Sequence, residues 1–237
     1  MTAPLVFEEV PLAKAPRASV AALPGADLTL AGRFSLTVRP HETVAVTGDE
    51  LSGVDFLGGL ALGLEEPAGG RVLTLGEQVT LLSRSAQLAF RRRVGYLPAG
   101  EGLLQNLTLR DNIRLPLRFG SDFRQKDIEG RVDVIVAQLR LTRVADLRPA
   151  EANAEDRRRA ALGRALAFDP ELVIAEDPFE GMTERTSAEL LEAARGGETA
   201  EGGRRTVLVT GPGLPGLLRT RVDRAVRVVR GVVEEGR

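Results

Sequence analysis

The sequence predicts an α/β fold in which a mostly parallel sheet is flanked by helices. Two observations support this. Short β-branched runs alternate along the chain with segments of helical periodicity, which is the pattern of parallel strands connected by helices. The stretch from about 100 to 163 has no clear strand, which indicates a helical subdomain inserted into the chain. We therefore predict one domain, 1–237, with an α/β core over about 1–99 and 164–237 and a helical subdomain over about 100–163.

The first half of the chain contains three short strand patterns before its first helix. Strands are predicted over 5–10, 34–38 and 43–48, and the intervening stretch 11–26 is an Ala- and Pro-rich loop. The run at 43–48 is β-branched and ends in glycine, as buried parallel strands do. Apolar residues spaced by three, one and three positions then predict a helix after Phe56.

Strands and helices continue to alternate in the second half. Helical periodicity prevails over 108–141, with breaks expected at Pro116 and Gly120. The other predicted elements are a strand and turn over 71–82, a strand ending near Leu97, a helix starting near Ala154, a buried strand over 171–176, a helix over 186–195, a strand over 206–211 and a terminal hairpin over 225–235.

Composition excludes several kinds of chemistry. The chain has 237 residues, 32 basic and 33 acidic, so its net charge of −1 gives no reason to expect a nucleic-acid partner. Cysteine is absent, which excludes disulfides and thiol chemistry. His41 is the only histidine and lies in a turn, where a surface role is favoured over a ligand role. No metal site is expected. Lysine occurs only at Lys14 and Lys126, so mechanisms that need a lysine have almost no candidate.

The turn after the strand at 43–48 has the layout of a phosphate-binding loop. A strand ends in Gly48, a turn containing Gly53 follows, and a helix begins. Such a loop needs backbone N–H groups at a helix N-terminus, a Lys for the β- and γ-phosphates and a Ser or Thr for Mg²⁺. Val54 and Asp55 stand at the Lys and hydroxyl positions. Taken alone, the turn favours a plain strand–turn–helix.

Five segments whose motifs fall at matching spacing change that interpretation. The loop and its helix fit the pattern G-x-x-G-x-G-K-[ST] followed by G-L-x-x-P-x-x-G at Gly48, Gly53, Gly63, Leu64, Pro67 and Gly70. From about Phe34 to Gly236 the chain resembles the ATP-binding cassette (ABC) transporter ATPase domain, most closely cassettes of lipid and lipoprotein transport. The resembling segments are 91–117 around the Q-loop, 149–178 with the signature motif and Walker B strand, 206–211 before the switch histidine, and the late positions Val222, Asp223, Arg224 and Gly231. The resemblance implies a P-loop fold with an N-terminal antiparallel β portion.

The resemblance does not extend to the positions that carry the family's chemistry. Besides Val54 and Asp55, Leu51 replaces a loop glycine, Ala99 replaces the Q-loop glutamine and Gly211 the switch histidine. The Walker B pair is inverted to Glu176 and Asp177. The signature becomes Ala152, Asn153, Ala154, Glu155 and Asp156, and the D-loop aspartate becomes Thr183. Carboxylates beside a triphosphate cost on the order of 4 kcal/mol per like-charge pair at ~4 Å.

These departures predict a catalytically degenerate subunit that takes no cofactor. Gly48, Gly53, Val54, Asp55, Ala99 and Gly211 are then vestigial nucleotide positions, and Glu176 and Asp177 serve as caps or ion-pair partners. Two alternatives stay open. One is an active but atypical ATPase that binds ATP and Mg²⁺ and uses Glu176 or Asp177. The other is a stand-alone regulatory or adaptor module.

Partner binding is expected where the family receives a permease's cytoplasmic helix. Leu103, Leu104, Asn106 and Leu107 are the candidate contacts, with the leucines forming an apolar floor. The expected partner is an integral-membrane permease, a second cassette, or a second copy of this chain. No secretory signal and no apolar run of ~18 residues is present, so a cytoplasmic protein held at the inner membrane by its partner is expected, without direct insertion.

The arginines at 157–159 begin a helix. A solvated face that pairs with Glu151 and Glu155 is favoured there over a nucleic-acid patch.

Overall fold

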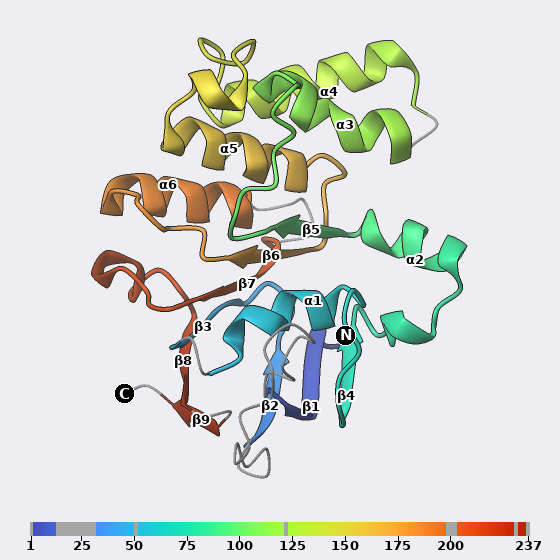
Figure 1. Ribbon diagram of the computed structural model, residues 1–237, viewed down its shortest axis with the longest axis vertical. Helices are drawn as coiled ribbons and strands as arrows, with labels where there is room; N and C mark the ends of the chain where they lie inside the picture. Colours follow the sequence, from blue (N-terminus) through green and yellow to red (C-terminus); the bar gives the residue numbers. More distant parts are fainter. Residues whose placement is uncertain are drawn as a thin grey trace, which may run out of the picture.

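The computed structural model describes residues 2–12, 32–49, 52–120, 123–197, 203–229 and 232–235 (Figure 1). The expectations for Leu51, for most of the loop at 11–26 and for Gly231 lie outside these residues.

A six-stranded sheet crosses the middle of the molecule in the order β5-β6-β7-β3-β8-β9 (Figure 1). All its pairs are parallel except the terminal hairpin of β8 and β9, so the predicted mostly parallel sheet is confirmed. Side chains of β3 are buried on both faces of the sheet, which explains the continuous apolar run. The strands are β3 Thr43–Gly48, β5 Val94–Leu97, β6 Leu172–Glu176, β7 Thr206–Gly211, β8 Arg224–Val229 and β9 Val232–Glu235.

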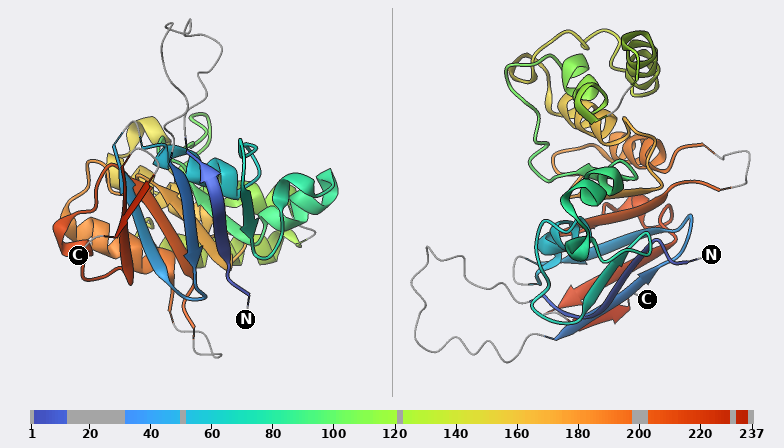
Figure 2. Two further views of the ribbon diagram at one scale, coloured as in Figure 1. Left: turned by 90° about the horizontal axis from the view of Figure 1, so that it is seen from below. Right: turned by 90° about the vertical axis from the view of Figure 1, so that its right-hand side faces the viewer.

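A second, antiparallel sheet of three strands lies on the side away from the helical layers (Figure 2). Its order is β2-β1-β4, and its strands are β1 Leu5–Pro11, β2 Arg33–Val38 and β4 Arg71–Thr74. Every second residue of β2 is buried, as its alternating sequence predicts. Phe7 and Phe34 meet edge to face between β1 and β2, with ring centroids 5.4 Å apart.

Helices cover the other side of the large sheet and form a separate layer beyond it. In Figure 1, α6 lies on the sheet, whereas α3, α4 and the α5 helix build the upper part of the molecule. The α-helices are α1 Leu57–Ala61, α2 Arg84–Arg91, α3 Leu109–Gly120, α4 Gln125–Gln138, α5 Ala154–Ala165 and α6 Glu184–Arg195, with 3₁₀ turns at Val54–Phe56, Val79–Leu81, Pro149–Glu151 and Gly216–Leu218.

The buried side chains form two clusters on opposite faces of the large sheet. One lies between the two sheets and includes Val44 and Val46, and the other lies under the helices and includes Ala45. Gly163 allows α3 and α5 to pack closely, because a β-carbon there would lie 3.0 Å from Ile113 Cδ1.

The expected break at Pro116 is wrong, because α3 runs through it from Leu109 to Gly120. Residues 121–122 lie outside the described part of the chain, so the expected break at Gly120 stays a prediction. Pro116 cannot donate a backbone bond to Asn112 one turn earlier. The helix continues because Leu109, Ile113 and Leu117 are fully buried on one face, and this packing outweighs one lost hydrogen bond. None of the helices in the described part of the chain is both long and apolar enough to cross a membrane.

Candidate functional site

The vestigial positions gather at the carboxyl ends of four neighbouring strands. Gly48 ends β3, Ala99 follows β5, Glu176 ends β6 and Gly211 ends β7. Because β5, β6, β7 and β3 are consecutive and parallel, these four ends share one edge of the sheet. The structure therefore brings these positions, which the sequence singled out, together at one location.

The loop after β3 is closed by hydrogen bonds among its own groups. Ser52 N–H donates to the Asp49 carbonyl at 3.0 Å, and the Ser52 hydroxyl donates to the same carbonyl at 2.5 Å. Val54 N–H donates to the Ser52 hydroxyl oxygen, and Phe56 N–H to the Gly53 carbonyl. A phosphate-binding loop points such N–H groups at its anion, whereas here three of them have acceptors within the loop.

Two glycines of the loop are closely packed against neighbouring groups. A β-carbon on Gly53, whose φ is +77°, would lie 2.0 Å from the carbonyl oxygen of Leu12. A β-carbon on Gly48 would lie 2.3 Å from the Ser52 hydroxyl oxygen. Both positions therefore need glycine for close packing against Leu12 and Ser52. Leu51 lies outside the described residues.

The two residues at the Lys and Ser/Thr positions point to different environments. Val54 is 3% exposed and packs in the cluster between the two sheets with Leu12. Asp55 is exposed, and its charge contributes to raising the pKa of Glu176. A 3₁₀ turn, Val54–Phe56, precedes α1, which has five residues. The loop thus directs an apolar side chain inward and a carboxylate outward.

Glu176 is held by a tyrosine. Its Oε2 accepts a hydrogen bond of 2.8 Å from the Tyr96 hydroxyl, and burial raises the pKa of the carboxyl. The Tyr96 hydroxyl and the Ala99 backbone N–H partly offset the effect of burial on the pKa of Glu176. Burial and the bond to Glu176 also raise the pKa of Tyr96. Glu176 therefore accepts hydrogen bonds from both groups at the end of β5.

Asp177 adopts a strained backbone conformation next to Gly211. Its φ is +41°, and its N–H donates to the Thr210 carbonyl at 2.7 Å. A β-carbon on Gly211 would lie 3.3 Å from Asp177 Oδ1, so the switch position and the second carboxylate are adjacent. Burial and Glu180 raise the pKa of Asp177, while Arg158 lowers it.

The expected roles of the two carboxylates need correction. Neither caps a helix, because Thr183 is the residue that caps α6, through a bond from Thr186 N–H to its hydroxyl. Among the described residues, neither Glu176 nor Asp177 takes part in an ion pair within 4.0 Å.

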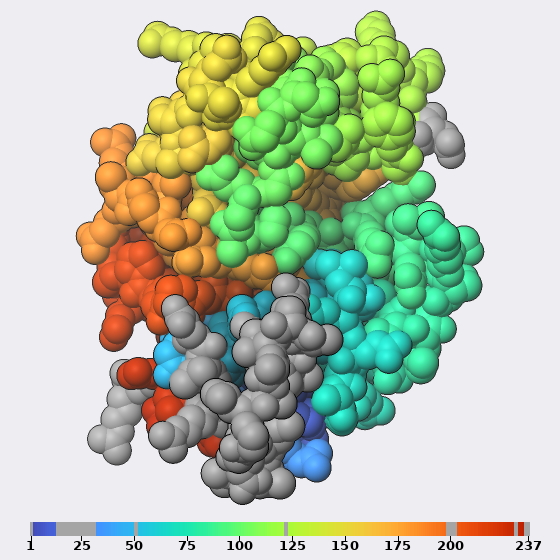
Figure 3. Space-filling model, viewed as in Figure 1, coloured from blue at the N-terminus to red at the C-terminus, as the bar shows by residue number. Residues whose placement is uncertain are grey.

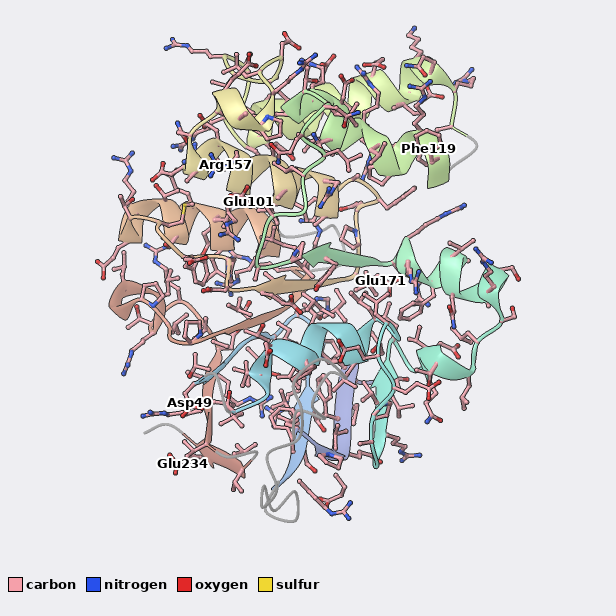
Figure 4. The ribbon with its side chains drawn as sticks, in the orientation of Figure 1. Asp49, Glu101, Phe119, Arg157, Glu171 and Glu234 are labelled. Atoms are coloured by element: carbon pink, nitrogen blue, oxygen red, sulfur yellow. The ribbon has the colours of Figure 1, made fainter. Side chains whose placement is uncertain are left out.

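Three arginines of α5 fasten the segment that follows β5. Arg158, 4% exposed, donates to the Ala99 carbonyl at 2.8 Å, and Arg164 donates to the Glu101 and Gly102 carbonyls at 3.0 and 2.6 Å. Arg157 pairs with the Glu101 carboxylate at 3.1 Å, and these two side chains lie side by side in Figure 4. We call Arg157, Arg158 and Arg164 the arginine clamp.

The expected pairing of the arginines at 157–159 with Glu151 and Glu155 is wrong. Arg157 and Arg158 belong to the clamp, and Arg159 pairs with Glu189 at 3.1 Å. Sequence position alone gave no sign of a target in the segment after β5, because Ala99 and Arg158 are 59 residues apart in the chain.

The residues at the signature position are bonded within the chain. Asn153 caps α5 by accepting from Asp156 N–H at 2.8 Å, and Glu155 accepts from the Thr186 hydroxyl at 2.9 Å. Glu155 and Asp156 place two carboxylates in the first turn of α5, where the helix dipole favours negative charge. The first turn of α5 is therefore stabilised by its own side chains.

The expected apolar floor is not formed as a unit. Leu103 is 7% exposed and belongs to the core under the helices, so it is corrected from a contact residue to a core residue. Leu104 is 44% exposed, Asn106 is exposed and Leu107 is partly buried. A tight turn cannot direct all these side chains to one surface.

Asn112 of α3, not Asn106, organises this segment. It is fully buried, its Oδ1 accepts from Leu104 N–H at 2.8 Å, and its Nδ2 donates to the Leu104 and Thr108 carbonyls at 3.1 and 2.9 Å. The Thr108 hydroxyl oxygen, just before α3, accepts a hydrogen bond from Asp111 N–H. A polar residue on the buried face of an amphipathic helix was the signal for Asn112.

His41 occupies a surface turn, as expected. It is exposed, with φ at +65°, and its Nδ1 bonds to the Arg204 carbonyl. Within the described ranges, no three His, Asp or Glu side chains are grouped so as to hold a metal ion.

The fold and the arrangement of this edge define a class of protein: P-loop α/β domains with an inserted helical layer. A family model described as ABC transporter matches residues 31–180, and the chain belongs to this family.

Curated relatives match over different lengths. The lipoprotein-releasing system ATP-binding protein LolD of Chromohalobacter salexigens is 30% identical over 88% of this chain and 86% of its own length. The methionine import ATP-binding protein MetN 2 of Pseudomonas aeruginosa is 31% identical over 66% of this chain. The chain spans about half the length of the MetN relatives, 47% in that case.

Solved structures share the fold at low sequence identity. The dimeric structure of MJ0796, described as a bacterial ABC transporter cassette, gives a TM-score of 0.81 at 20% identity and covers 98% of this chain and 97% of that one. CbiO1 from Clostridium perfringens, described as part of the ABC transporter complex cbiONQ, gives 0.77 at 17% identity, covering 99% and 88%. These similarities confirm the predicted cassette fold with its antiparallel sheet.

Proposed function

We propose that this chain is a degenerate cassette subunit of a membrane transport complex and does not hydrolyse ATP itself. The observation that carries the proposal is the closed loop after β3, in which the Leu12 carbonyl faces Gly53 and Val54 replaces the lysine. Phosphoryl transfer depends on positioned cations and N–H donors rather than on covalent chemistry by the protein. A loop without that lysine and bonded to itself supports a role without nucleotide.

The surrounding charge favours the same conclusion. Burial first, and then the charges of Asp55 and Glu65, raise the pKa of Glu176, so two further carboxylates lie within electrostatic reach of Glu176. A like-charge pair at ~4 Å costs on the order of 4 kcal/mol at an effective dielectric of 20. ATP and Mg²⁺ are therefore not proposed as cofactors.

The proposed partners are a permease, a second cassette or a second copy of the chain. LolD and MetN are named for lipoprotein release and methionine import, which supports assignment to a transport complex but leaves the cargo open. The dimeric form of MJ0796 supports pairing between cassettes. We place the protein on the cytoplasmic side of the inner membrane, held there by its partner.

Titration calorimetry with ATP, with and without Mg²⁺, tests the proposal. We expect no binding tighter than about 1 mM. Micromolar affinity that requires Mg²⁺ would instead favour the active but atypical ATPase, with Glu176 or Asp177 as its catalytic carboxylate.

A further inference from the structure

A cleft of about 470 Å³ lies beside α6. Its walls come from the end of α4, from α5, from α6 and from the 3₁₀ turn Gly216–Leu218 with the residues that follow it. In Figure 3, the yellow, orange and red segments that contain α5, α6 and this turn are stacked along the left-hand side of the molecule. The described residues that line this cleft, which we call the α6 cleft, include none of the vestigial nucleotide positions.

The α6 cleft is rich in positive charge. Its described lining contains four arginines and two carboxylates. The arginines, which we call the α6 arginines, are Arg140, Arg159, Arg185 and Arg221, and the carboxylates are Glu189 and Glu192. Because the whole chain has a net charge of −1, this excess of arginine is a local feature of one surface.

Three of the α6 arginines share one carboxylate, that of Glu189. Arg140 and Arg159 approach it to 2.9 and 3.1 Å, and Arg185 approaches it to 3.3 Å. Burial raises the pKa of Glu189, but the hydrogen bond from Arg185 and the charge of Arg140 outweigh burial and hold that pKa below 4.5. In these bonds each arginine uses one of the five N–H donors of its guanidinium group. One carboxylate is therefore shared by three cations, which favours a second anion beside them.

Arg221 lies at the limit of ion-pair distance from its carboxylate. Its Nη1 is 4.0 Å from Glu192 Oε1. Arg195 and Arg204 approach Glu192 more closely, to 3.4 and 3.1 Å, and neither of them lines the cleft. Both glutamates of the cleft are therefore outnumbered by the arginines around them.

The backbone of Arg140 is held in an unusual conformation. Arg140 follows Leu139, the C-cap of α4, and its φ is +58°. Glycine is the usual residue at this place, because a residue with a side chain is strained when φ is positive. Strain of this kind is concentrated at binding and functional sites. Here it accompanies an arginine whose guanidinium group reaches from the end of α4 to Glu189 on α6.

An exposed leucine lies in the same cleft. Leu217 is 42% exposed, and it lines the cleft together with the small side chains of Ala188 and Ala193. Aromatic side chains, on which the bases of nucleic acids stack, are missing from the described lining. The α6 cleft therefore offers one apolar contact among several cations.

We propose that the α6 cleft binds an acidic segment of a partner protein, whose carboxylates bond to the α6 arginines and whose apolar side chain packs on Leu217. Guanidinium groups recognise carboxylates through paired hydrogen bonds, so the charge and the donors of the cleft fit such a segment. A nucleic acid fits less well, because Glu189 and Glu192 would lie against its continuous row of phosphates. The inference goes beyond the proposed function and does not depend on it, since the α6 cleft and the nucleotide edge share no residue.

The absence of tryptophan from the chain allows a direct measurement of binding. Two synthetic peptides of about ten residues serve as probes, and each carries one central Trp as its apolar side chain. Glu residues flank the Trp in one peptide, and Lys residues flank it in the other. We expect the Trp emission and anisotropy of the Glu peptide to change saturably with protein, and this peptide to bind at least about tenfold more tightly than the Lys peptide. Equal binding of the two peptides, or no binding of either, would overturn the proposal.

Charge reversal tests the arginines. In Arg140→Glu with Arg185→Glu, whose wild-type side chains are mostly exposed, we expect the preference to be inverted in favour of the Lys peptide. The control, Arg84→Glu with Arg91→Glu, makes the same change of net charge on α2, at exposed residues that do not line the cleft, and should keep the wild-type preference. Equal loss of Glu-peptide binding in both double variants would mean that net charge alone is responsible, and would contradict the proposal.

Truncation of Leu217 tests the apolar contact without changing any charge. We expect the Glu peptide to bind at least about threefold more weakly to Leu217→Ala than to the wild type. Leu81→Ala, at an exposed leucine outside the cleft, should leave binding unchanged. Equal binding by these two variants would overturn the placement of the peptide on Leu217.

Two other ligands give separate outcomes, and each would also overturn the proposal. One is a single-stranded DNA oligonucleotide that binds more tightly than the Glu peptide and no longer binds Arg140→Glu with Arg185→Glu. The other is a phosphatidylglycerol vesicle that shows the same two results. ATP calorimetry stays independent, because micromolar ATP binding with intact peptide discrimination would refute the proposed function but not this inference.

Discussion

The carbonyl oxygen of Leu12 lies only 2.0 Å from the place that a β-carbon on Gly53 would occupy. This contact joins the end of β1 to the loop after β3, and both residues are buried. The loop therefore depends on glycine for packing as well as for its φ of +77°.

Gly53→Ala should lower the free energy of unfolding by about 2–4 kcal/mol, since alanine adds left-handed strain to a backbone overlap. Gly181→Ala is the matched control, because φ there is +68° and nothing lies within 4 Å of the added carbon. It should cost about 1 kcal/mol. Urea unfolding measures both, and equal costs would mean that the Leu12 contact is unimportant.

Val54→Lys combined with Asp55→Ser should not produce ATP hydrolysis. Ala99, Gly211 and the Leu12 contact remain unchanged in this variant. Phosphate release is the measurement, after a melting curve has shown that the domain folds with a lysine at a position 3% exposed. Asp55→Ser alone serves as the folded control. Turnover in the double variant would show that the other replacements matter little.

Leu104→Asp should leave stability within about 1 kcal/mol of wild type, because the side chain is largely exposed. Leu103→Asp should cost more than about 3 kcal/mol, because it places a charge in the core under the helices. Thermal melting compares the two. If Leu104 contacts a partner, Leu104→Asp will also abolish pull-down of that partner by a folded protein, and unchanged pull-down would remove Leu104 from the docking surface.

Asn112→Ala should destabilise the domain by about 2–3 kcal/mol, because it leaves backbone groups of Leu104 and Thr108 without their buried partner. Asn106→Ala, at an exposed position, should change stability by less than about 0.5 kcal/mol. Chemical unfolding of both variants measures the two changes in the free energy of unfolding. A larger effect at Asn106 would contradict the geometry.

Glu176→Gln should become more stable relative to wild type as pH rises from the ordinary Glu pKa of 4.5 through the raised pKa of the folded state. Burial raises the pKa of Glu176 in the fold above its ordinary value of 4.5, so the native state binds more protons than the unfolded state in that window. The Glu176 carboxyl therefore contributes to the free energy of unfolding of the wild type at low pH. This contribution is lost as pH rises through the raised pKa. Urea unfolding at several pH values measures the difference, and a pH-independent difference would contradict burial as the cause.

Sequence patterns predicted the fold in most elements because packing demands and local propensities agree there. The run at 43–48 is β-branched with three consecutive apolar residues at its centre, and β3 is buried on both faces. Pro116 is the exception, since local propensity favoured a break and the buried face of α3 prevailed. The strand order was not predicted from the sequence, and it is the parallel order β5-β6-β7-β3 that brings Ala99, Glu176 and Gly211 to one edge.

The sequence by itself determined which chemical groups are available: Val54 and Asp55 in the loop, Glu176 before Asp177, and almost no lysine or histidine. Only the tertiary structure decided what those groups contact. Leu12 reaches Gly53 across about 40 residues, and Arg158 reaches Ala99 across 59, so neither contact follows from local periodicity. Local sequence does not define a partner for these glycines and arginines. The contacts form because packing of the sheet and helices brings distant backbone carbonyls within reach of them.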